Sequence, residues 1–216
     1  MKKINKTVIT TLVCLIPMVA GLLLYDKLPD TIATHWGMND NPDGYSSKFA
    51  AVFVFPAIMA LVNIFVPLIM KADPKEKNMD ENLKNVVYWI IPLISLLCSV
   101  LTISEGMGIH INISGAVPIV LGVMFAYIGN YMPKTRQSYT MGVRLPWTLN
   151  SEENWNRTHR IAGFVWVIGG LLMVLVGIIN LLGYSAVSTI LLIVSIIIMV
   201  FVPCIYSYIL YRKENI

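Results

Sequence analysis

Six long apolar runs occupy most of this 216-residue chain, and their length limits what it can fold into. A helix needs about 20 apolar residues to cross the hydrocarbon core of a bilayer, and every run is close to that length. Backbone groups must be paired inside a membrane, and the runs lack the strict apolar–polar alternation of a membrane β-barrel. The sequence therefore predicts an all-α membrane protein, a six-transmembrane-helix bundle with spans at residues 7–25, 49–70, 85–103, 115–132, 161–183 and 187–210.

The basic residues predict the orientation of these helices. If the chain starts in the cytoplasm, 14 of its 16 lysines and arginines lie on the cytoplasmic side, and only Lys27 and Lys48 lie outside. Cytoplasmic loops of membrane proteins carry such an excess of positive charge, so both termini are predicted to be cytoplasmic. The outer face then has five acidic residues against two lysines, a net charge of −3 that would attract a cationic ligand.

The chain is predicted to be a single multi-pass integral domain of a cell membrane, residues 1–216. Residues 1–70 hold the first helix pair with an outer loop at 26–48, and residues 115–216 hold the last three helices with an inner loop at 133–160. Segment 71–84 mixes four basic with four acidic residues, which is typical of a solvated connector.

The membrane interior contains little that could drive chemistry. No ionisable residue falls in the middle of a predicted helix, although ion- and proton-coupled transporters usually have one there. The sequence shows no glycine-rich phosphate loop and no nucleophile beside an oriented base, and its three scattered cysteines favour neither disulfides nor a metal cluster. We therefore expect no enzyme, no cofactor and no direct contact with nucleic acid. A transporter or a metal-dependent membrane enzyme is the less favoured alternative.

The fourth run carries a pattern of small residues. Gly115, Gly122 and Gly129 recur every seven residues, which permits close approach of another helix. This pattern predicts a packing seam, and Asn130 at its inner end is placed to bond across to a neighbouring helix.

The outer loop contains the turn sequence Asn41-Pro42-Asp43-Gly44. Proline presets φ, aspartate bonds its own backbone, and glycine accepts a positive φ, so we predict an ordered turn packed against the helices. One histidine with two nearby acids, Asp40 and Asp43, is weak support for a metal site. The candidate ligand-binding residues of the outer loop are His35, Trp36, Asp40, Asp43, Gly44 and Lys48.

The inner loop contains a helix-start signal. Asn150 followed by Glu153 fits a capping box, which predicts a helix over residues 151–160 that continues into the fifth span. Trp155 and His159, four residues apart, would share one face of that helix.

Residues 142–148 precede this helix, and Pro146 is expected to hold Leu145 extended. Two interpretations stay open: the loop binds a protein or peptide, or its tryptophans and arginines only anchor an interfacial segment. The candidate residues are Asn130, Gly142, Arg144, Pro146, Trp147, Thr148, Trp155 and His159.

The run GVRLPWTL at 142–149, followed by Ser151, Trp155, Thr158 and His159, resembles the signature of the SdpI family of bacterial immunity proteins. Gly129-Asn130 also fits that signature, and the outer loop is similar to a domain of unknown function often found ahead of it. The resemblance implies a membrane protein that protects a producing cell from a secreted, membrane-active peptide toxin. It also implies a receptor role, in which the toxin-bound protein holds a transcriptional repressor at the membrane.

The partners expected from this resemblance are a peptide toxin on the outer face, a cytosolic transcriptional repressor on the inner face, and the lipid bilayer. A membrane receptor or structural protein of unknown ligand remains the alternative.

Overall fold

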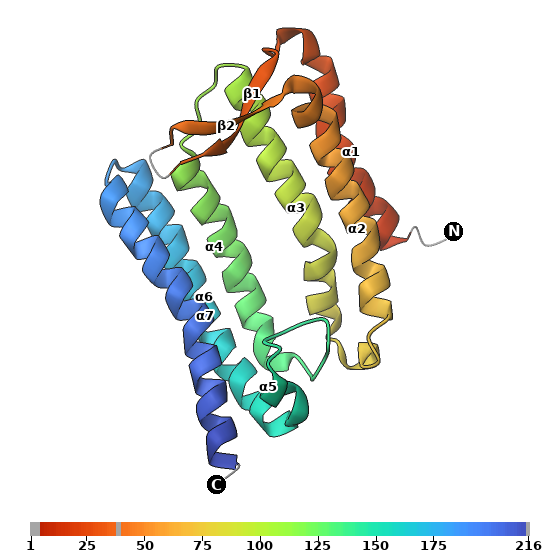
Figure 1. Ribbon diagram of the computed structural model, residues 1–216, viewed down its shortest axis with the longest axis vertical. Coiled ribbons are helices and arrows are strands. Elements are labelled where there is room, and N and C mark those ends of the chain that lie inside the picture. The colour runs from red at the N-terminus through yellow and green to blue at the C-terminus, as the bar shows by residue number, and fades with distance from the viewer. Residues whose placement is uncertain (1–4, 38–39, 215–216) are drawn as a thin grey trace. The chain divides into compact units, whose positions relative to one another are not determined.

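The computed structural model describes residues 5–37 and 40–214. In this part of the chain six helices are long and apolar enough to cross a membrane, which confirms the all-α membrane fold. The long helices are α1 (Lys6–Leu23), α2 (Phe55–Lys71), α3 (Glu81–Gly106), α4 (Ile113–Tyr131), α6 (Glu152–Leu181) and α7 (Ser185–Glu214) (Figure 1). The cytoplasmic placement of the termini stays a prediction.

Contacts within the chain form two compact units. The first comprises Met1–Ile69 and Asn85–Ile113, and the second comprises Met70–Lys84 and Ser114–Ile216. The outer loop belongs to the first unit and the inner loop to the second. The single membrane domain expected from the sequence stays a prediction.

The outer loop of the first unit forms a β-hairpin, a longer element than the turn that the sequence predicts. Strand β1 (Thr31–Trp36) pairs antiparallel with β2 (Pro42–Ser47). Ile32 and Ala33 are buried, whereas the polar residues of β2 leave no hydrophobic alternation for sequence reasoning to detect. Pro42 opens its strand, a position where a missing amide is tolerated.

A small apolar core anchors this hairpin to the helices of the first unit. A Cβ on Gly21 of α1 would lie 2.5 Å from Val52, and one on Gly106 of α3 would lie 2.9 Å from Leu28, so both helices approach the core closely. A π-helix, Ala50–Val54, leads into α2 and supplies half of the core. The core residues are Leu28, Ile32, Ala51 and Val52.

Buried polar groups tie the helices of the first unit together. The Asn63 side-chain amide on α2 donates to the hydroxyls of Thr10 and Thr11 on α1, each at 3.0 Å. The Ser95 hydroxyl on α3 donates to the Cys14 carbonyl at 3.1 Å. Such bonds stabilise helix association where the surrounding lipid offers no hydrogen-bonding partner.

Glycines on two helices form the packing seam of the second unit, as the sequence predicts for α4. A Cβ on Gly122 would lie 2.5 Å from the Gly170 carbonyl, and one on Gly177 would lie 2.5 Å from the Gly115 carbonyl. The partner helix is α6, whose glycines at 163, 170 and 177 repeat the same seven-residue spacing. The sequence contained this second repeat, and matching it to α4 would have identified the pair.

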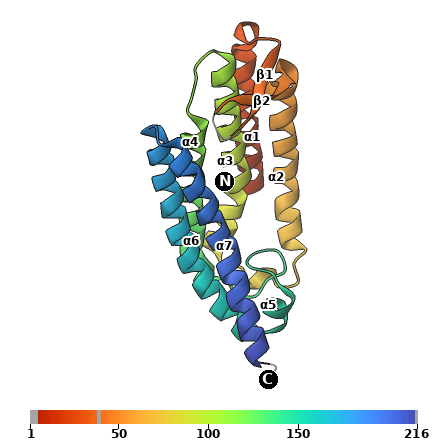
Figure 2. The ribbon, with the colours of Figure 1, turned by 60° about the vertical axis from the view of Figure 1, so that its left-hand side comes forward.

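Helices α6 and α7 run side by side in both ribbon views (Figures 1 and 2). The chain reverses between them at Gly183, whose φ of +94° favours glycine. The Trp166 ring nitrogen donates to the Met199 carbonyl at 3.0 Å, and the Asn180 amide donates to the Ser188 hydroxyl at 2.9 Å. These bonds fix α7 against α6.

Candidate functional site

A short helix, α5 (Pro146–Asn150), begins where the sequence places an extended residue before proline. Leu145 has φ −115° and ψ 155°, the extended conformation that Pro146 imposes. The buried Thr148 hydroxyl accepts from the Leu145 amide at 2.8 Å and lies 2.8 Å from the Val143 carbonyl, to which it can donate. The Thr148 side chain therefore stabilises the start of α5 through its bonds to Leu145 and Val143. Because this side chain is fully buried, it cannot contact a partner.

The start of α6 corrects the predicted capping box. Asn150 is the last residue of α5, and Ser151 is the N-cap of α6. The Ser151 hydroxyl accepts from the Asn154 amide at 3.1 Å. The predicted N-cap lies one residue too early along the chain. Serine and asparagine are both favourable N-cap residues, and Asn150 is excluded from this position only because it already belongs to α5.

Trp155 and His159 share one face of α6 as predicted, and both are fully buried. Their rings stack with centroids 3.9 Å apart. The Trp155 ring nitrogen donates to the Thr135 carbonyl at 2.7 Å. His159 Nε2 accepts from the Val143 amide at 2.9 Å, so His159 Nδ1 carries the proton and donates to the Trp155 carbonyl at 2.8 Å. Both nitrogens of His159 are therefore occupied.

Gly142 makes this stacked pair possible. Its φ is +108°, a conformation that other residues rarely adopt. A Cβ on Gly142 would overlap His159 Nε2 and lie 2.9 Å from the Trp155 ring. The glycine of the motif is thus required both by its backbone conformation and by the space beside the two rings.

Trp147 connects α5 to α7. Its ring nitrogen donates to the Ser207 hydroxyl at 2.5 Å, and its ring stacks on Tyr211 with centroids 5.7 Å apart. The buried Asn154 amide donates to the Ser207 carbonyl at 3.0 Å. The last helix is thereby fixed against the inner loop.

A buried carboxylate that sequence reasoning missed organises the rest of the inner loop. Asp73, 6% exposed, follows α2 and accepts on Oδ2 from the hydroxyls of Ser138 at 2.7 Å and Thr140 at 2.8 Å. The same oxygen accepts from the amides of Tyr139 and Thr140, each at 2.9 Å. Oδ1 accepts from the Lys75 amide at 2.8 Å. We call this arrangement the Asp73 clasp.

The Asp73 clasp corrects the prediction that segment 71–84 is only a solvated connector. Asp73-Pro74 is a turn signal, but nothing local points to a partner loop 65 residues further along the chain. Burial acts to raise the pKa of Asp73, and the hydrogen bonds from Ser138, Lys75 and Thr140 outweigh it, so this pKa lies below its ordinary value. The carboxylate is therefore charged at neutral pH.

The remaining charged residues of the inner loop are at the surface. Arg144 is exposed, and one of its guanidinium nitrogens donates to the Tyr139 carbonyl at 2.8 Å. Arg157 pairs with Glu153 at 2.7 Å, and Pro146 and Asn130 are exposed. Among the candidate residues of the inner loop, Thr148, Trp155 and His159 are buried and Trp147 is half-buried. The exposed candidates are Asn130, Gly142, Arg144 and Pro146.

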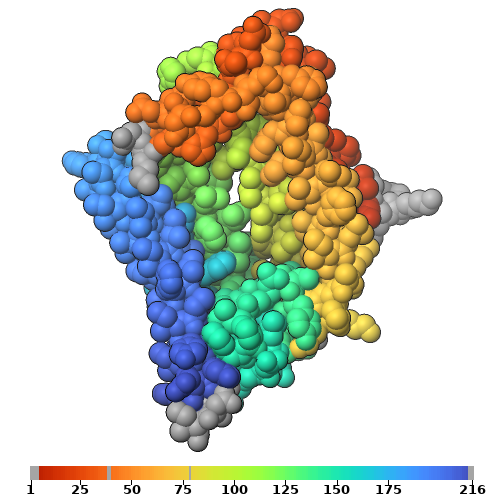
Figure 3. Space-filling model, viewed as in Figure 1, coloured from red at the N-terminus to blue at the C-terminus, as the bar shows by residue number. Residues whose placement is uncertain are grey.

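The outer loop presents its candidate residues differently. His35 Nδ1 lies 2.5 Å from Asp43 Oδ1 across the hairpin, with the two side chains 74% and 53% exposed. Gly44 stands opposite His35 in the register, and a Cβ on Gly44 would lie 2.9 Å from that of His35. A larger side chain at position 44 would collide with His35, which explains the glycine at this position. Figure 3 shows the hairpin, in orange, at the surface of its unit.

The other candidates of the outer loop, Trp36, Asp40 and Lys48, are half-buried. Asp40 has a φ of +57°. Lys48 pairs with Asp30 at 3.1 Å and lies 4.9 Å from the centre of the Tyr25 ring. Among the described residues, no group of three or more histidine, cysteine, aspartate or glutamate side chains could hold a metal ion.

Comparison with known proteins places both loops within recognised sequence regions. Residues 134–207 match the SdpI/YfhL protein family, and residues 12–60 match a domain of unknown function, DUF1648. The chain is 25% identical over 215 residues to "Immunity protein SdpI" of Bacillus subtilis (strain 168), a match that covers 98% of each protein. No solved structure matches the chain. The similarity to the SdpI/YfhL family thus covers the inner loop and most of α6 and α7, and the similarity to DUF1648 covers the outer hairpin.

Proposed function

We propose that this protein is a non-enzymatic immunity protein of the bacterial cell membrane, which protects the cell from a secreted, membrane-active peptide toxin. The observation that carries the proposal is the match to the Bacillus subtilis immunity protein over 98% of both chains, hairpin and inner loop included. The six membrane-length helices support the same conclusion, because a protein embedded in the bilayer can meet a toxin that acts there.

The toxin would be met at the outer face. The predicted outer segments carry five acidic residues against two lysines, and the His35–Asp43 pair of the hairpin is exposed. A net negative surface raises the local concentration of a cationic peptide and its rate of association. The candidate contact residues remain those of the outer loop: His35, Trp36, Asp40, Asp43, Gly44 and Lys48.

A second, receptor function at the inner face would use the exposed residues of the inner loop. Tyr139 is 47% exposed, and Arg136, Arg144 and Arg160 are exposed as well. The contacts that Trp147, Thr148, Trp155 and His159 make inside the protein support a structural role for these four side chains. A cytosolic repressor would therefore bind the surface formed by Arg136, Tyr139, Arg144 and Arg160. The side chains bonded inside the inner loop would maintain the conformation of that surface.

Such signalling needs two arrangements of the protein that differ in affinity for the toxin and for the inner partner. Opening of the Asp73 clasp would provide the second arrangement of the inner loop. Residues 138–140 depend on this one side chain for four of their hydrogen bonds.

The protective role is tested in a Bacillus subtilis strain that lacks its own SdpI. This protein is expressed there, and the cells are challenged with peptides concentrated from the medium of the parent strain. We expect the wild-type protein to restore growth and the Asp40→Asn, Asp43→Asn double variant to restore it less. The control, Glu152→Gln with Glu153→Gln, removes the same charge from the inner loop. Absence of rescue by a well-expressed wild-type protein would contradict the proposal for this toxin.

The receptor role is tested by following toxin-dependent recruitment of cytosolic proteins to the membrane. Arg144→Ala should abolish recruitment and leave protection unchanged, whereas Arg157→Ala, which removes an arginine paired with Glu153, should change neither. If Arg144→Ala recruits the same proteins at the same level, the inner loop is only structural.

A further inference from the structure

One uninterrupted stretch of chain connects the outer hairpin to the Asp73 clasp. The Ser47 hydroxyl at the end of β2 accepts from the Ala50 amide at 3.2 Å, and Ala50 begins a helical segment, Ala50–Lys71, that is long enough to cross a membrane. The Asp73 amide then donates to the Met70 carbonyl at 3.3 Å, so the clasp residue is bonded to the last turn of α2. A displacement of this helix therefore reaches Asp73 through the backbone.

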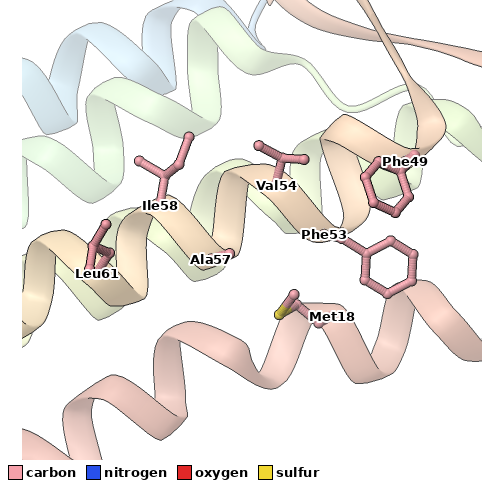
Figure 4. A pocket seen from close by; sticks show the side chains of 7 residues that line it. All are labelled: Met18, Phe49, Phe53, Val54, Ala57, Ile58 and Leu61. Carbon is pink, nitrogen blue, oxygen red and sulfur yellow. The ribbon is translucent and has the colours of Figure 1, made fainter.

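The start of this helix is packed on the hairpin and on α1. It supplies two of the four residues of the small core that anchors the hairpin. Figure 4 shows the Phe53 side chain extending from this helix toward α1, and the Phe53 ring lies 5.7 Å from the ring of Tyr25. Further along the helix, the Asn63 amide bonds to Thr10 and Thr11 of α1. Because packed interiors transmit displacement, a shift of the hairpin is passed to this helix.

The other side of the clasp is anchored to different helices. The Gln137 side-chain amide donates to two carbonyls of α5, at 2.7 and 2.9 Å. The Val143 amide donates to the His159 ring of α6 at 2.9 Å. Residues 138–140 lie between these two attachment points, so they stay with α5 and α6 when Asp73 is displaced.

The clasp is sensitive to a small displacement. The four bonds from residues 138–140 to Asp73 Oδ2 are between 2.7 and 2.9 Å long, and such bonds are lost beyond about 3.5 Å. Helix shifts of about 1–2 Å are common in switching transitions. A shift of that size is enough to break the clasp.

Tyr139 links the clasp to the exposed arginines of the inner loop. Its amide donates to Asp73 Oδ2 at 2.9 Å, and its carbonyl accepts from the Arg144 guanidinium at 2.8 Å. The Lys75 ammonium group, two residues after Asp73, lies 5.3 Å from the centre of the Tyr139 ring. While the clasp is closed, segment 71–84 therefore holds Tyr139, and Tyr139 holds Arg144.

We propose that the helix Ala50–Lys71 transmits toxin binding from the hairpin to the inner loop: its displacement withdraws Asp73 from residues 138–140 and releases Tyr139 and Arg144 to a cytosolic partner. The inference rests on the proposed immunity and receptor functions, and it identifies how the first regulates the second. Most of α2 and α3 belongs to the first unit, whereas segment 71–84 between them belongs to the second. A displacement of the first unit thus reaches the second through the segment that carries Asp73.

Two insertions of equal length test this route. Gly-Ser-Gly-Ser between residues 71 and 72 places a flexible link between α2 and Asp73, and the same four residues between 77 and 78 place one between the clasp and α3. Each insertion interrupts a backbone hydrogen bond on its own side of the clasp. Both leave the bonds from residues 138–140 to Asp73 in place, so the two variants differ in which helix they disconnect.

The readout is amide hydrogen exchange at Tyr139 and Thr140, because both amides donate to Asp73 Oδ2. The purified protein in lipid nanodiscs is mixed with peptides concentrated from the medium of the Bacillus subtilis parent strain, or with a concentrate that does not kill unprotected cells. We expect the killing peptides to speed exchange about tenfold in the wild type and in the 77–78 insertion, and not in the 71–72 insertion. Equal responses of the two insertion variants, or no response in a wild-type protein that protects cells, would overturn the proposal.

A point substitution tests the release of Arg144 without an insertion. Asp73→Asn weakens the clasp itself and should recruit cytosolic proteins to the membrane without toxin, whereas Glu76→Gln, which removes the same charge from the same segment, should still require toxin. Recruitment by Asp73→Asn that depends on toxin as in the wild type would contradict the release of Arg144 by the open clasp.

Protection and recruitment separate this inference from the functions on which it rests. Both insertion variants should protect cells like the wild type, because the hairpin is unchanged, and the 71–72 insertion alone should lose toxin-dependent recruitment. If the wild-type protein gives no protection, the immunity function fails and the route fails with it. If the wild type protects and its exchange responds but no cytosolic protein is recruited, the receptor function fails and transmission to the inner loop stands.

Discussion

Each loop contains a histidine next to an aromatic residue, in His35-Trp36 and in the Trp155–His159 pair, yet the two histidines have opposite surroundings. The His35 side chain is 74% exposed and pairs with an exposed carboxylate, whereas His159 is fully buried with both ring nitrogens bonded. The densest motif of the sequence thus has its Trp155–His159 pair packed inside the protein, whereas the hairpin presents His35 and Asp43 to solvent. A motif that is rich in reactive residue types is not for that reason an accessible site.

The comparison predicts large losses of stability for changes in the inner loop. Gly142→Ala should have the greatest effect, because a Cβ would overlap His159 Nε2 at a residue whose φ is +108°. We expect a loss of about 3–5 kcal/mol in the free energy of unfolding, from the backbone strain and the overlap together. The measurement is the thermal unfolding midpoint of the purified protein in detergent.

Gly183→Ala is the matched control. Gly183 has a similar φ of +94°, but no atom lies within 4 Å of an added Cβ. Only the backbone cost of about 1–2 kcal/mol is expected. Equal effects of the two substitutions would show that the stacked pair does not restrict Gly142.

Asp73→Asn should have the next largest effect. The asparagine side chain has no charge and only one acceptor oxygen, so it cannot accept both the four bonds that Asp73 Oδ2 receives from residues 138–140 and the bond that Oδ1 receives from the Lys75 amide. We expect a loss of about 2–3 kcal/mol in the free energy of unfolding. Glu76→Gln removes the same charge from the same connector and should change stability little. Faster proteolysis of the inner loop in the Asp73 variant alone would report the open clasp.

The pH dependence of the same carboxylate follows from its lowered pKa. In the unfolded chain this pKa is about 3.9, so the clasp contributes its full stability above that pH and loses it as the pH falls through the lower folded value. Between about pH 5 and pH 3 the wild-type midpoint should therefore fall further than that of Asp73→Asn. If the unfolding midpoints of the two proteins fall equally with pH, the Asp73 carboxylate is not the source of this pH dependence.

Trp147→Phe should have a smaller effect. It keeps an aromatic ring beside Tyr211 and removes the hydrogen bond to Ser207, a change of about 1 kcal/mol. Trp89→Phe changes a tryptophan that is 42% exposed on α3 and should be neutral. If both substitutions are neutral, the bond between α5 and α7 adds nothing to the stability of the inner loop.

The hairpin should show the smallest change in stability and a clear change in protection. Because His35 and Asp43 are both exposed, replacing His35 with alanine should cost at most about 1 kcal/mol. Protection against the secreted peptides should nevertheless fall. An unfolded hairpin in the His35→Ala variant, detected by rapid amide exchange over residues 31–47, would remove the contrast between the two loops.

Much of the membrane architecture could be predicted because it depends on local sequence. All six spans follow from apolar length, and the extended Leu145, the shared face of Trp155 and His159, and the glycine seam of α4 follow from short-range rules. The hairpin escaped prediction because β2 carries polar residues and depends on Ile32 and the π-helix for its support. The Asp73 clasp escaped it because its two halves are 65 residues apart.

The sequence by itself determined that the chain enters a membrane six times, since hydrocarbon accepts only long apolar segments with paired backbones. Its charges also predict which loops face the cytoplasm. Only the tertiary structure decided which polar side chains of those loops are bonded inside the protein and which remain exposed. The physical reason is that a buried polar group must find a partner, and that partner, such as Ser138 for Asp73 or Ser207 for Trp147, can lie anywhere along the chain.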